Sequence, residues 1–259
     1  MILIYFIILI VLYLYIKRDN KMNNGRNIYV INMLKDKDRY DKIKNSGSNF
    51  NIIRENAVDG SKLDIEEMKK EGLIKINSES FPFSKNINRD TLNGSIGCTL
   101  SHINLWKKLS KKNDDYFIIL EDDAIIRDNT HEKINDLMNK IKDTNLEWDI
   151  LFLGGSRIYG SREKNGLIRA IYTNSWMNCG LFAYIINRKS IPKLINKAYP
   201  INTYIDMQIN KYYGNGINAF YTNPHIITHN YDFGSTRDTF KNKYTSEFIN
   251  DANKIFTIN

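Results

Sequence analysis

Three acidic residues, Glu121, Asp122 and Asp123, stand side by side directly after the apolar run "YFIIL". In an open α/β sheet, ligands bind beyond the carboxyl ends of the strands, so this position places carboxylates at the mouth of a crevice. Clustered carboxylates repel one another, and a divalent cation such as Mg²⁺ or Mn²⁺ offsets that repulsion by binding their oxygens. The plain alternative is a solvated acidic turn that caps the following helix. The preceding strand leaves both interpretations open.

Apolar runs and helical periodicity predict strands and helices in alternation around this triplet, which is typical of an α/β sheet. We expect strands within 27–32, 51–60, 116–120, 148–155 and 179–188, with edge strands in 218–230. We expect helices within 33–43, 101–112, 131–143 and 190–199. Ser101 and Ser190 are the predicted N-caps of two of these helices.

Composition favours one core and a small anionic ligand. The chain has 259 residues with 42% hydrophobic content, enough for one sizeable core. Its net charge is +8, but Lys and Arg are scattered among Asp and Glu, and no nucleic-acid-binding motif occurs. We therefore expect no nucleic-acid partner. Cys98 and Cys179 lie far apart and indicate neither a CxxC metal site nor a disulfide framework.

The first sixteen residues are apolar without interruption and end at Lys17 and Arg18. A helix of that length measures about 24 Å, against a hydrocarbon core of about 30 Å. A cleaved signal peptide is disfavoured, because there is no basic start and no small-residue cleavage site. We therefore expect a single-pass membrane anchor over 1–18. The basic residues after it favour a catalytic domain on the cytoplasmic face.

A polar linker is expected over 19–27, a catalytic domain over 28–240 and a tail over 241–259. A second argument for the cytoplasmic face is the sequon Asn93-Gly94-Ser95. A glycan at that position would obstruct the expected ligand cleft.

Five motifs, in order and at these separations, resemble the family 25 glycosyltransferases. They read "YVINMLKDKDRYDKI", "AVDG", "LNGSIGCTLSHINLWKKL", "FIILEDDAI" and "WDILFLGG". The resemblance implies a GT-A fold, an open mixed sheet with flanking helices, in a single Rossmann-like nucleotide-sugar-binding domain. It also implies transfer of a hexose from a UDP-sugar, with inversion, to a hydroxyl of a glycan, a lipid-linked saccharide or a protein hydroxylysine.

The same resemblance implies roles for particular residues. The cofactor would be Mn²⁺ or Mg²⁺, held by Glu121, Asp123 and His229, and the general base would be Asp206. Donor contacts would come from Asn32, Arg39, Gly94, Gly97, His102 and Asp122. A carboxylate-held cation would neutralise the pyrophosphate leaving group, with help from Lys35 or Arg39.

Plainer interpretations of these residues stay open. His102 can be a satisfied buried histidine, Gly94 and Gly97 can serve turn geometry, and Asp206 can be a helix N-cap. Departures from the family wording include "NMLK", where an acidic residue usually follows "NL".

Two other functions also remain. A metal-dependent phosphotransferase or nucleotidyltransferase would need phosphate-cradling glycines, which the sequence lacks. An inactive sugar- or nucleotide-binding relative would be expected to lose the triplet, His229 or Asp206, and all are present.

Overall fold

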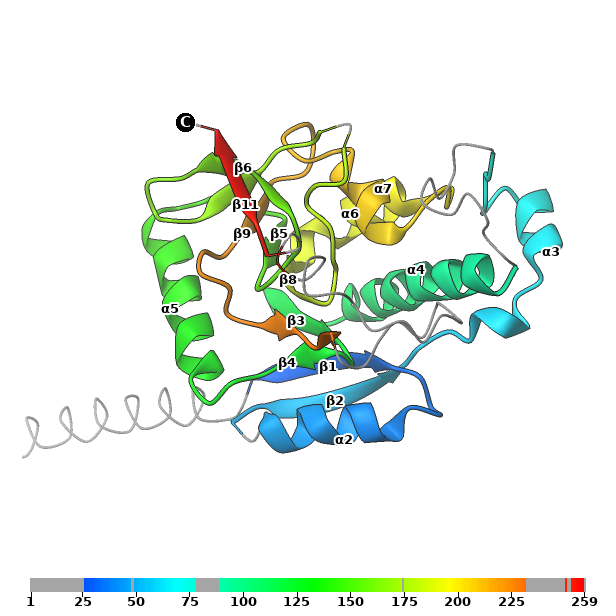
Figure 1. Cartoon of the computed structure of the whole chain (residues 1–259), viewed down its shortest axis with the longest axis horizontal. Coiled ribbons are helices and arrows are strands. Elements are labelled where there is room, and N and C mark those ends of the chain that lie inside the picture. Colours follow the sequence, from blue (N-terminus) through cyan, green and yellow to red (C-terminus); the bar gives the residue numbers. More distant parts are fainter. Residues whose placement is uncertain are drawn as a thin grey trace, which may run out of the picture.

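The computed structural model describes residues 26–47, 49–77, 89–173, 175–231, 250 and 253–258, built around a nine-stranded sheet (Figure 1). Its strands, in chain order, are β1 (Asn27–Asn32), β2 (Asn51–Asn56), β3 (Tyr116–Glu121), β5 (Ile150–Phe152), β6 (Ile158–Arg162), β7 (Ile168–Ala170), β8 (Ala183–Asn187), β9 (Ala219–Tyr221) and β11 (Ile255–Ile258). Across the sheet they run β11-β6-β7-β9-β5-β8-β3-β1-β2. A two-stranded ribbon pairs β4 (Ala124–Ile125) with β10 (Thr228–His229).

The sheet is mixed. Strand β1 runs parallel to both β2 and β3, whereas β8 is antiparallel to its two neighbours, β3 and β5. Ile31 pairs with Glu121, so β1 and β3 end at the same edge of the sheet. The acidic triplet therefore follows a carboxyl end, as its position after an apolar run predicts.

Helices cover both faces of the sheet (Figure 1). They are α2 (Lys37–Ser46), α3 (Ile65–Lys70), α4 (Arg89–Leu109), α5 (Thr130–Asp143), α6 (Ile191–Ala198) and α7 (Ile205–Asn210), with 3-10 turns η1 (Gly60–Lys62) and η2 (Arg188–Ser190). Alternate strand residues serve opposite faces. On one face, Tyr29 and Ile119 pack with α4, α6 and α7, and on the other, Val30 and Ile118 pack with α2 and α5. The predicted α/β class, with an open mixed sheet and flanking helices, is confirmed.

Several details of the predicted elements are wrong. Helix α4 begins at Arg89, so Ser101 lies inside it and donates to the Gly97 carbonyl instead of capping. Strand β9 is an interior strand between β7 and β5, not an edge strand. Ser190 stands at the N-cap of α6, but its hydroxyl donates to Asp149 and makes no cap hydrogen bond.

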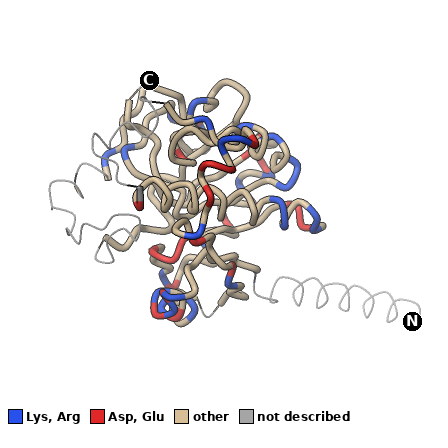
Figure 2. Tube along the Cα trace, turned by 90° about the vertical axis from the view of Figure 1, so that its right-hand side faces the viewer, with Lys and Arg blue, Asp and Glu red and all other residues tan. Residues whose placement is uncertain are grey.

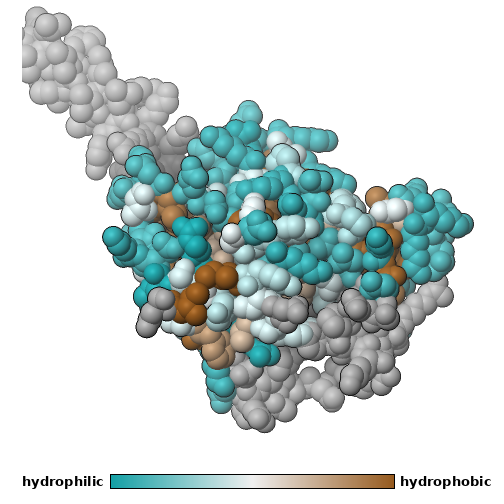
Figure 3. All heavy atoms as spheres, turned by 90° about the horizontal axis from the view of Figure 1, so that it is seen from above, coloured by the Kyte–Doolittle hydropathy of each residue, from teal (hydrophilic) through white to brown (hydrophobic). Residues whose placement is uncertain are grey.

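Charged side chains of both signs are interspersed along the described trace (Figure 2). The face shown in Figure 3 is mainly hydrophilic, with small and separate hydrophobic areas. The mixture of charges expected from the sequence therefore persists in three dimensions.

The predicted localisation, a single-pass membrane protein, needs correction. Within the described ranges, the structure contains no helix that is long and apolar enough to cross a membrane. The segment that carried the prediction, residues 1–18, lies outside the described residues, as does most of the predicted 241–259 tail. Residues 255–258 of that tail form β11, which pairs with β6.

Candidate active site

The three carboxylates at the turn between β3 and β4 have different partners. Asp122 Oδ2 accepts a hydrogen bond from Asn32 Nδ2 at 2.6 Å, and Arg39 Nη1 lies 3.5 Å from Asp122 Oδ1. Asn32 ends β1, and Arg54 Nε donates to its Oδ1 at 2.8 Å, which fixes the amide so that its nitrogen faces Asp122. The structure thus brings together three of the predicted donor-binding residues.

Burial raises the pKa of Asp122 to about 6, against the hydrogen bond from Asn32, which lowers it. The neighbouring charges of Asp123 and Glu121 add to the increase, and that of Arg39 opposes it. Asp123 and Glu121 thus repel a negative charge on Asp122, and a bound cation would relieve that repulsion.

Asp123 meets His229 across the ribbon of β4 and β10. His229 pairs with Ala124 in that ribbon, and its Nε2 lies 2.9 Å from Asp123 Oδ2. Asp123 Oδ1 is buried and has no hydrogen-bond partner among the described residues. A buried carboxylate oxygen without a hydrogen-bond partner, next to an imidazole, is suited to bind a divalent cation, because the cation would accept the lone pairs of that oxygen.

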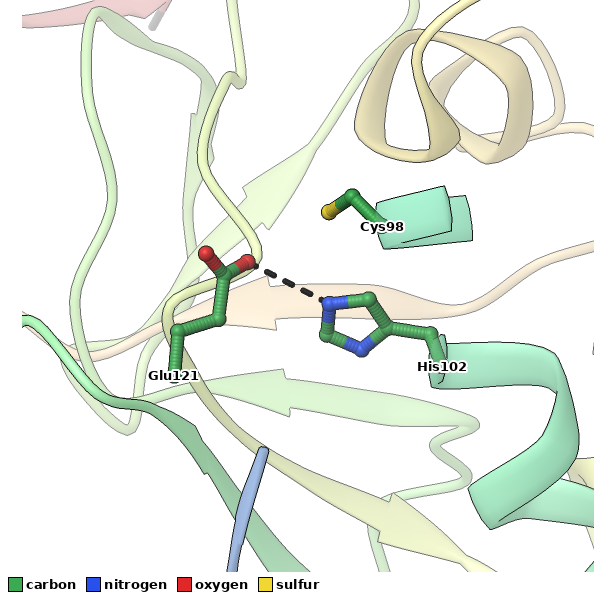
Figure 4. Close-up of side chains that lie close together, drawn as sticks. All are labelled: Cys98, His102 and Glu121. Atoms are coloured by element: carbon green, nitrogen blue, oxygen red, sulfur yellow. Dashed lines mark hydrogen bonds and ion pairs between the residues drawn. The ribbon is translucent and has the colours of Figure 1, made fainter. Parts of the chain in front are cut away.

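Glu121 turns toward helix α4. Its Oε1 lies 3.2 Å from His102 Nε2, and Cys98 lies one helical turn before His102 (Figure 4). One ligand atom from each of Cys98, His102 and Glu121 lies within 4.8 Å of the others, and within the described segments this is the one such group of three. The predicted metal set of Glu121, Asp123 and His229 is thus not gathered in one place, and its role stays a prediction.

His102 is buried completely, and its two ring nitrogens face protein groups. Its Nδ1 lies 2.9 Å from the Tyr184 hydroxyl on β8, while Nε2 faces Glu121. Trp106 Nε1 donates to the same Tyr184 hydroxyl at 2.8 Å. Burial raises the pKa of Tyr184 well above its ordinary value, so this hydroxyl keeps its proton.

A pocket of about 390 Å³ lies beside the ends of β1 and β3, between the segment after β2 and the first half of α4. Four predicted site residues line it: Gly94, His102, Glu121 and Asp122. Asn32, Arg39, Gly97, Asp123, Asp206 and His229 are not among its lining residues. Its volume is suited to a small-molecule ligand.

Two glycines let one wall of this pocket form. A Cβ on Gly97 would lie 2.8 Å from the Val58 carbonyl oxygen and 2.9 Å from the Gly60 nitrogen. A Cβ on Gly60 would lie 2.1 Å from the Asn93 carbonyl oxygen. Gly97 therefore serves close packing of α4 against the segment after β2, and its contact with the donor stays a prediction.

Asp206 lies in the first turn of α7. Its Oδ2 accepts from the Gly180 amide at 2.9 Å and its Oδ1 from the Met207 amide at 2.8 Å. The N-cap of α7 is Tyr204, so Asp206 is not an N-cap aspartate. Gly180 lies two residues before Phe182, whose carbonyl accepts from the Glu121 amide at 2.8 Å, and this connects Asp206 to the edge that carries the triplet.

Other residues of the site were not assigned a role from the sequence. Asp59, Asp90 and Asn93 line the pocket, and Tyr184 contacts His102. The "AVDG" motif contains Asp59 and was the available signal for it. Nothing in a continuous apolar run such as β8 distinguishes the hydroxyl of Tyr184 from ordinary core packing.

Comparison with known proteins identifies the family. Residues 26–209, more than half of the chain, match the family model "Glycosyltransferase family 25 (LPS biosynthesis protein)". The chain belongs to glycosyltransferase family 25. The resemblance inferred from the five motifs is therefore confirmed.

Curated relatives of this family 25 chain include procollagen galactosyltransferase 2 of Homo sapiens, 25% identical over 198 residues that make up 71% of the chain and 30% of the relative. A Bos taurus relative, named a probable inactive glycosyltransferase 25 family member 3, is 26% identical over 57% of the chain and 24% of its own length. The chain thus spans about a third or less of these relatives.

Among solved structures, a glycosyltransferase involved in the glycosylation of the major capsid of PBCV-1 is 10% identical. Its TM-score is 0.43, and the match covers 82% of the chain and 95% of that protein.

Proposed function

We propose that this family 25 member is a metal-dependent glycosyltransferase that moves a hexose, such as galactose or glucose, from a UDP-sugar to a hydroxyl acceptor with inversion. The observation that carries the proposal is the pocket beside the triplet, in a chain whose family is established. Four of its lining side chains, Asp59, Asp90, Glu121 and Asp122, are carboxylates, against one cation, Lys35. A diphosphate would be repelled by that set alone, so the pocket calls for a bound cation.

Asp123 and His229 are the residues that we propose hold the cation, with Glu121 as the third predicted ligand. When bound, a divalent cation supplies Lewis-acid neutralisation of the diphosphate leaving group. Lys35 adds a positive charge from the pocket wall. Asn32 and Arg39 would act on the donor through Asp122, since both contact that carboxylate.

Asp206 is the proposed general base. In an inverting displacement, the acceptor oxygen attacks the anomeric carbon, the bond to the diphosphate breaks, and the base takes the acceptor's proton. Both Asp206 oxygens accept backbone amide hydrogen bonds, which fix the carboxylate in place. The acceptor would be a glycan, a lipid-linked saccharide or a protein hydroxyl such as hydroxylysine.

We propose residues 28–240 as the catalytic region. The test is a donor screen on the full chain, which measures release of the nucleotide from UDP-, GDP- and CMP-hexoses with Mn²⁺, with Mg²⁺ and with EDTA. The proposal expects release from a UDP-sugar that chelation removes. Release that is equal for all donors, or unchanged by EDTA, would contradict it, and no release from any donor would favour the inactive alternative.

A further inference from the structure

Trp106, Tyr184, His102 and Glu121 form one hydrogen-bonded series from the core to the pocket. The first three side chains are completely buried, whereas Glu121 reaches the pocket lining. The separations along the series are 2.8, 2.9 and 3.2 Å. Cys98 lies beside its outer end (Figure 4).

The direction of each hydrogen bond follows from the chemistry of the donors. An indole nitrogen can only donate, so the Tyr184 oxygen accepts from Trp106. The Tyr184 proton then has His102 Nδ1 as its acceptor among the described residues. A neutral imidazole that accepts at Nδ1 carries its proton on Nε2, and that proton points at the Glu121 carboxylate, which can only accept when ionised.

The reverse arrangement is less favourable. If His102 donated from Nδ1, the buried Tyr184 hydroxyl would keep a proton without an acceptor, and the desolvation of that hydroxyl would not be offset by a hydrogen bond. A neutral ring would also then turn the Nε2 lone pair toward the Glu121 oxygen. Only the first arrangement satisfies every donor in the series.

We infer that Trp106 and Tyr184 are positioning residues that hold His102 as the Nε2–H tautomer, and that this tautomer orients the Glu121 carboxylate into the pocket. The expected effect of Tyr184 on sugar transfer rests on the proposed function, whereas the assignment of the His102 tautomer does not.

The test begins with ¹⁵N NMR of the labelled full chain. In the wild type, His102 should show a protonated Nε2 and an unprotonated, hydrogen-bonded Nδ1. Tyr184→Phe removes the hydroxyl and should shift the Nδ1 resonance and mix the tautomers. Its transfer kcat should fall about tenfold, the lower end of what loss of an outer-shell partner costs.

Tyr221→Phe is the matched control. Tyr221 is also a fully buried strand tyrosine, but its hydroxyl has no hydrogen-bond partner in the described part of the chain. This variant should keep both the His102 resonances and kcat within about twofold of wild type, a change of less than about 0.5 kcal/mol. Thermal unfolding of the two variants checks that both fold.

The possible results distinguish the tautomer of His102 from its role in catalysis. A wild-type His102 protonated on Nδ1 would overturn the tautomer. A shifted tautomer in Tyr184→Phe with unchanged kcat would overturn the positioning role. If the wild type shows the expected tautomer but transfers no sugar, the proposed function fails while the tautomer assignment stands.

Discussion

Asp123 and His229 are 106 positions apart in sequence, yet the Asp123 Oδ2 and His229 Nε2 atoms lie 2.9 Å apart. The ribbon of β4 and β10 makes this contact, and the Asn230 amide donates to the Asp123 carbonyl at 2.7 Å. The backbone pairing of β4 with β10 therefore positions the Asp123 and His229 side chains next to each other.

Asp123→Asn should lower sugar transfer by at least about 10²-fold, because a neutral amide loses the charge that would bind the cation, an effect of several kcal/mol. The measurement is kcat/KM for the UDP-sugar over a Mn²⁺ titration. Asp128→Asn, an exposed carboxylate just beyond the turn, is the control. Equal losses in both variants would argue against a local role for Asp123.

Asp206→Asn should lower kcat by about 10²- to 10⁴-fold, as expected when a general base is removed. Donor affinity should be largely retained, since the Asn oxygen can still accept one of the two backbone amides that Asp206 now binds. Calorimetry with the UDP-sugar measures that affinity separately from turnover. A parallel loss of donor binding would make Asp206 a donor contact or a structural residue.

Gly97→Ala should destabilise the fold by about 1–3 kcal/mol, the usual cost of overpacking. The new Cβ would meet the Val58 carbonyl oxygen at 2.8 Å. Alanine favours a helix over glycine by up to about 1 kcal/mol, so propensity alone would stabilise the variant. Urea unfolding gives the sign, and a stabilised variant would show that α4 does not depend on this close approach.

His225→Asn should reduce the loss of stability in mild acid. Burial lowers the pKa of His225, against the hydrogen bond with the Thr222 carbonyl, so the folded protein binds fewer protons than the unfolded chain just below pH 6.5. Stability from this group is present at neutral pH and is lost as the pH falls below about 6.5. Unfolding midpoints at pH 7.5 and 5.5 measure it, and equal acid losses in variant and wild type would contradict the prediction.

Strands β1, β3, β5 and β8 were predictable because each is a short apolar run, and helix α5 was predictable from its helical period. Strands β6, β7 and β11 lie outside the strand ranges expected from the sequence. The start of α4 could not be predicted, because Gly94 and Gly97 are typical of a turn in the sequence. Only the structure shows that the segment after β2 packs closely against them, which requires glycine within a helix. The interior place of β9 depends on pairing with β5 and β7, which local sequence does not encode.

The position of the carboxylate triplet at the carboxyl end of a strand was predictable, but the arrangement of its side chains was not. Adjacent residues in a turn diverge, and the partners of Glu121 and Asp123 come from α4 and β10, far away in sequence. Residues that are adjacent in the motif, such as Glu121 and Asp123, therefore make separate contacts in the folded protein.

The pairing of β11 with β6 also matters while the chain is being made. Strands β6 and β7 are synthesised well before residues 255–258, so a nascent chain holds the outer side of β6 without its neighbour. A bare strand of that kind presents unpaired amide and carbonyl groups to any other strand, including one from a second nascent copy. The arrival of β11 pairs these groups of β6, and the edge of the finished sheet is then the short strand β11.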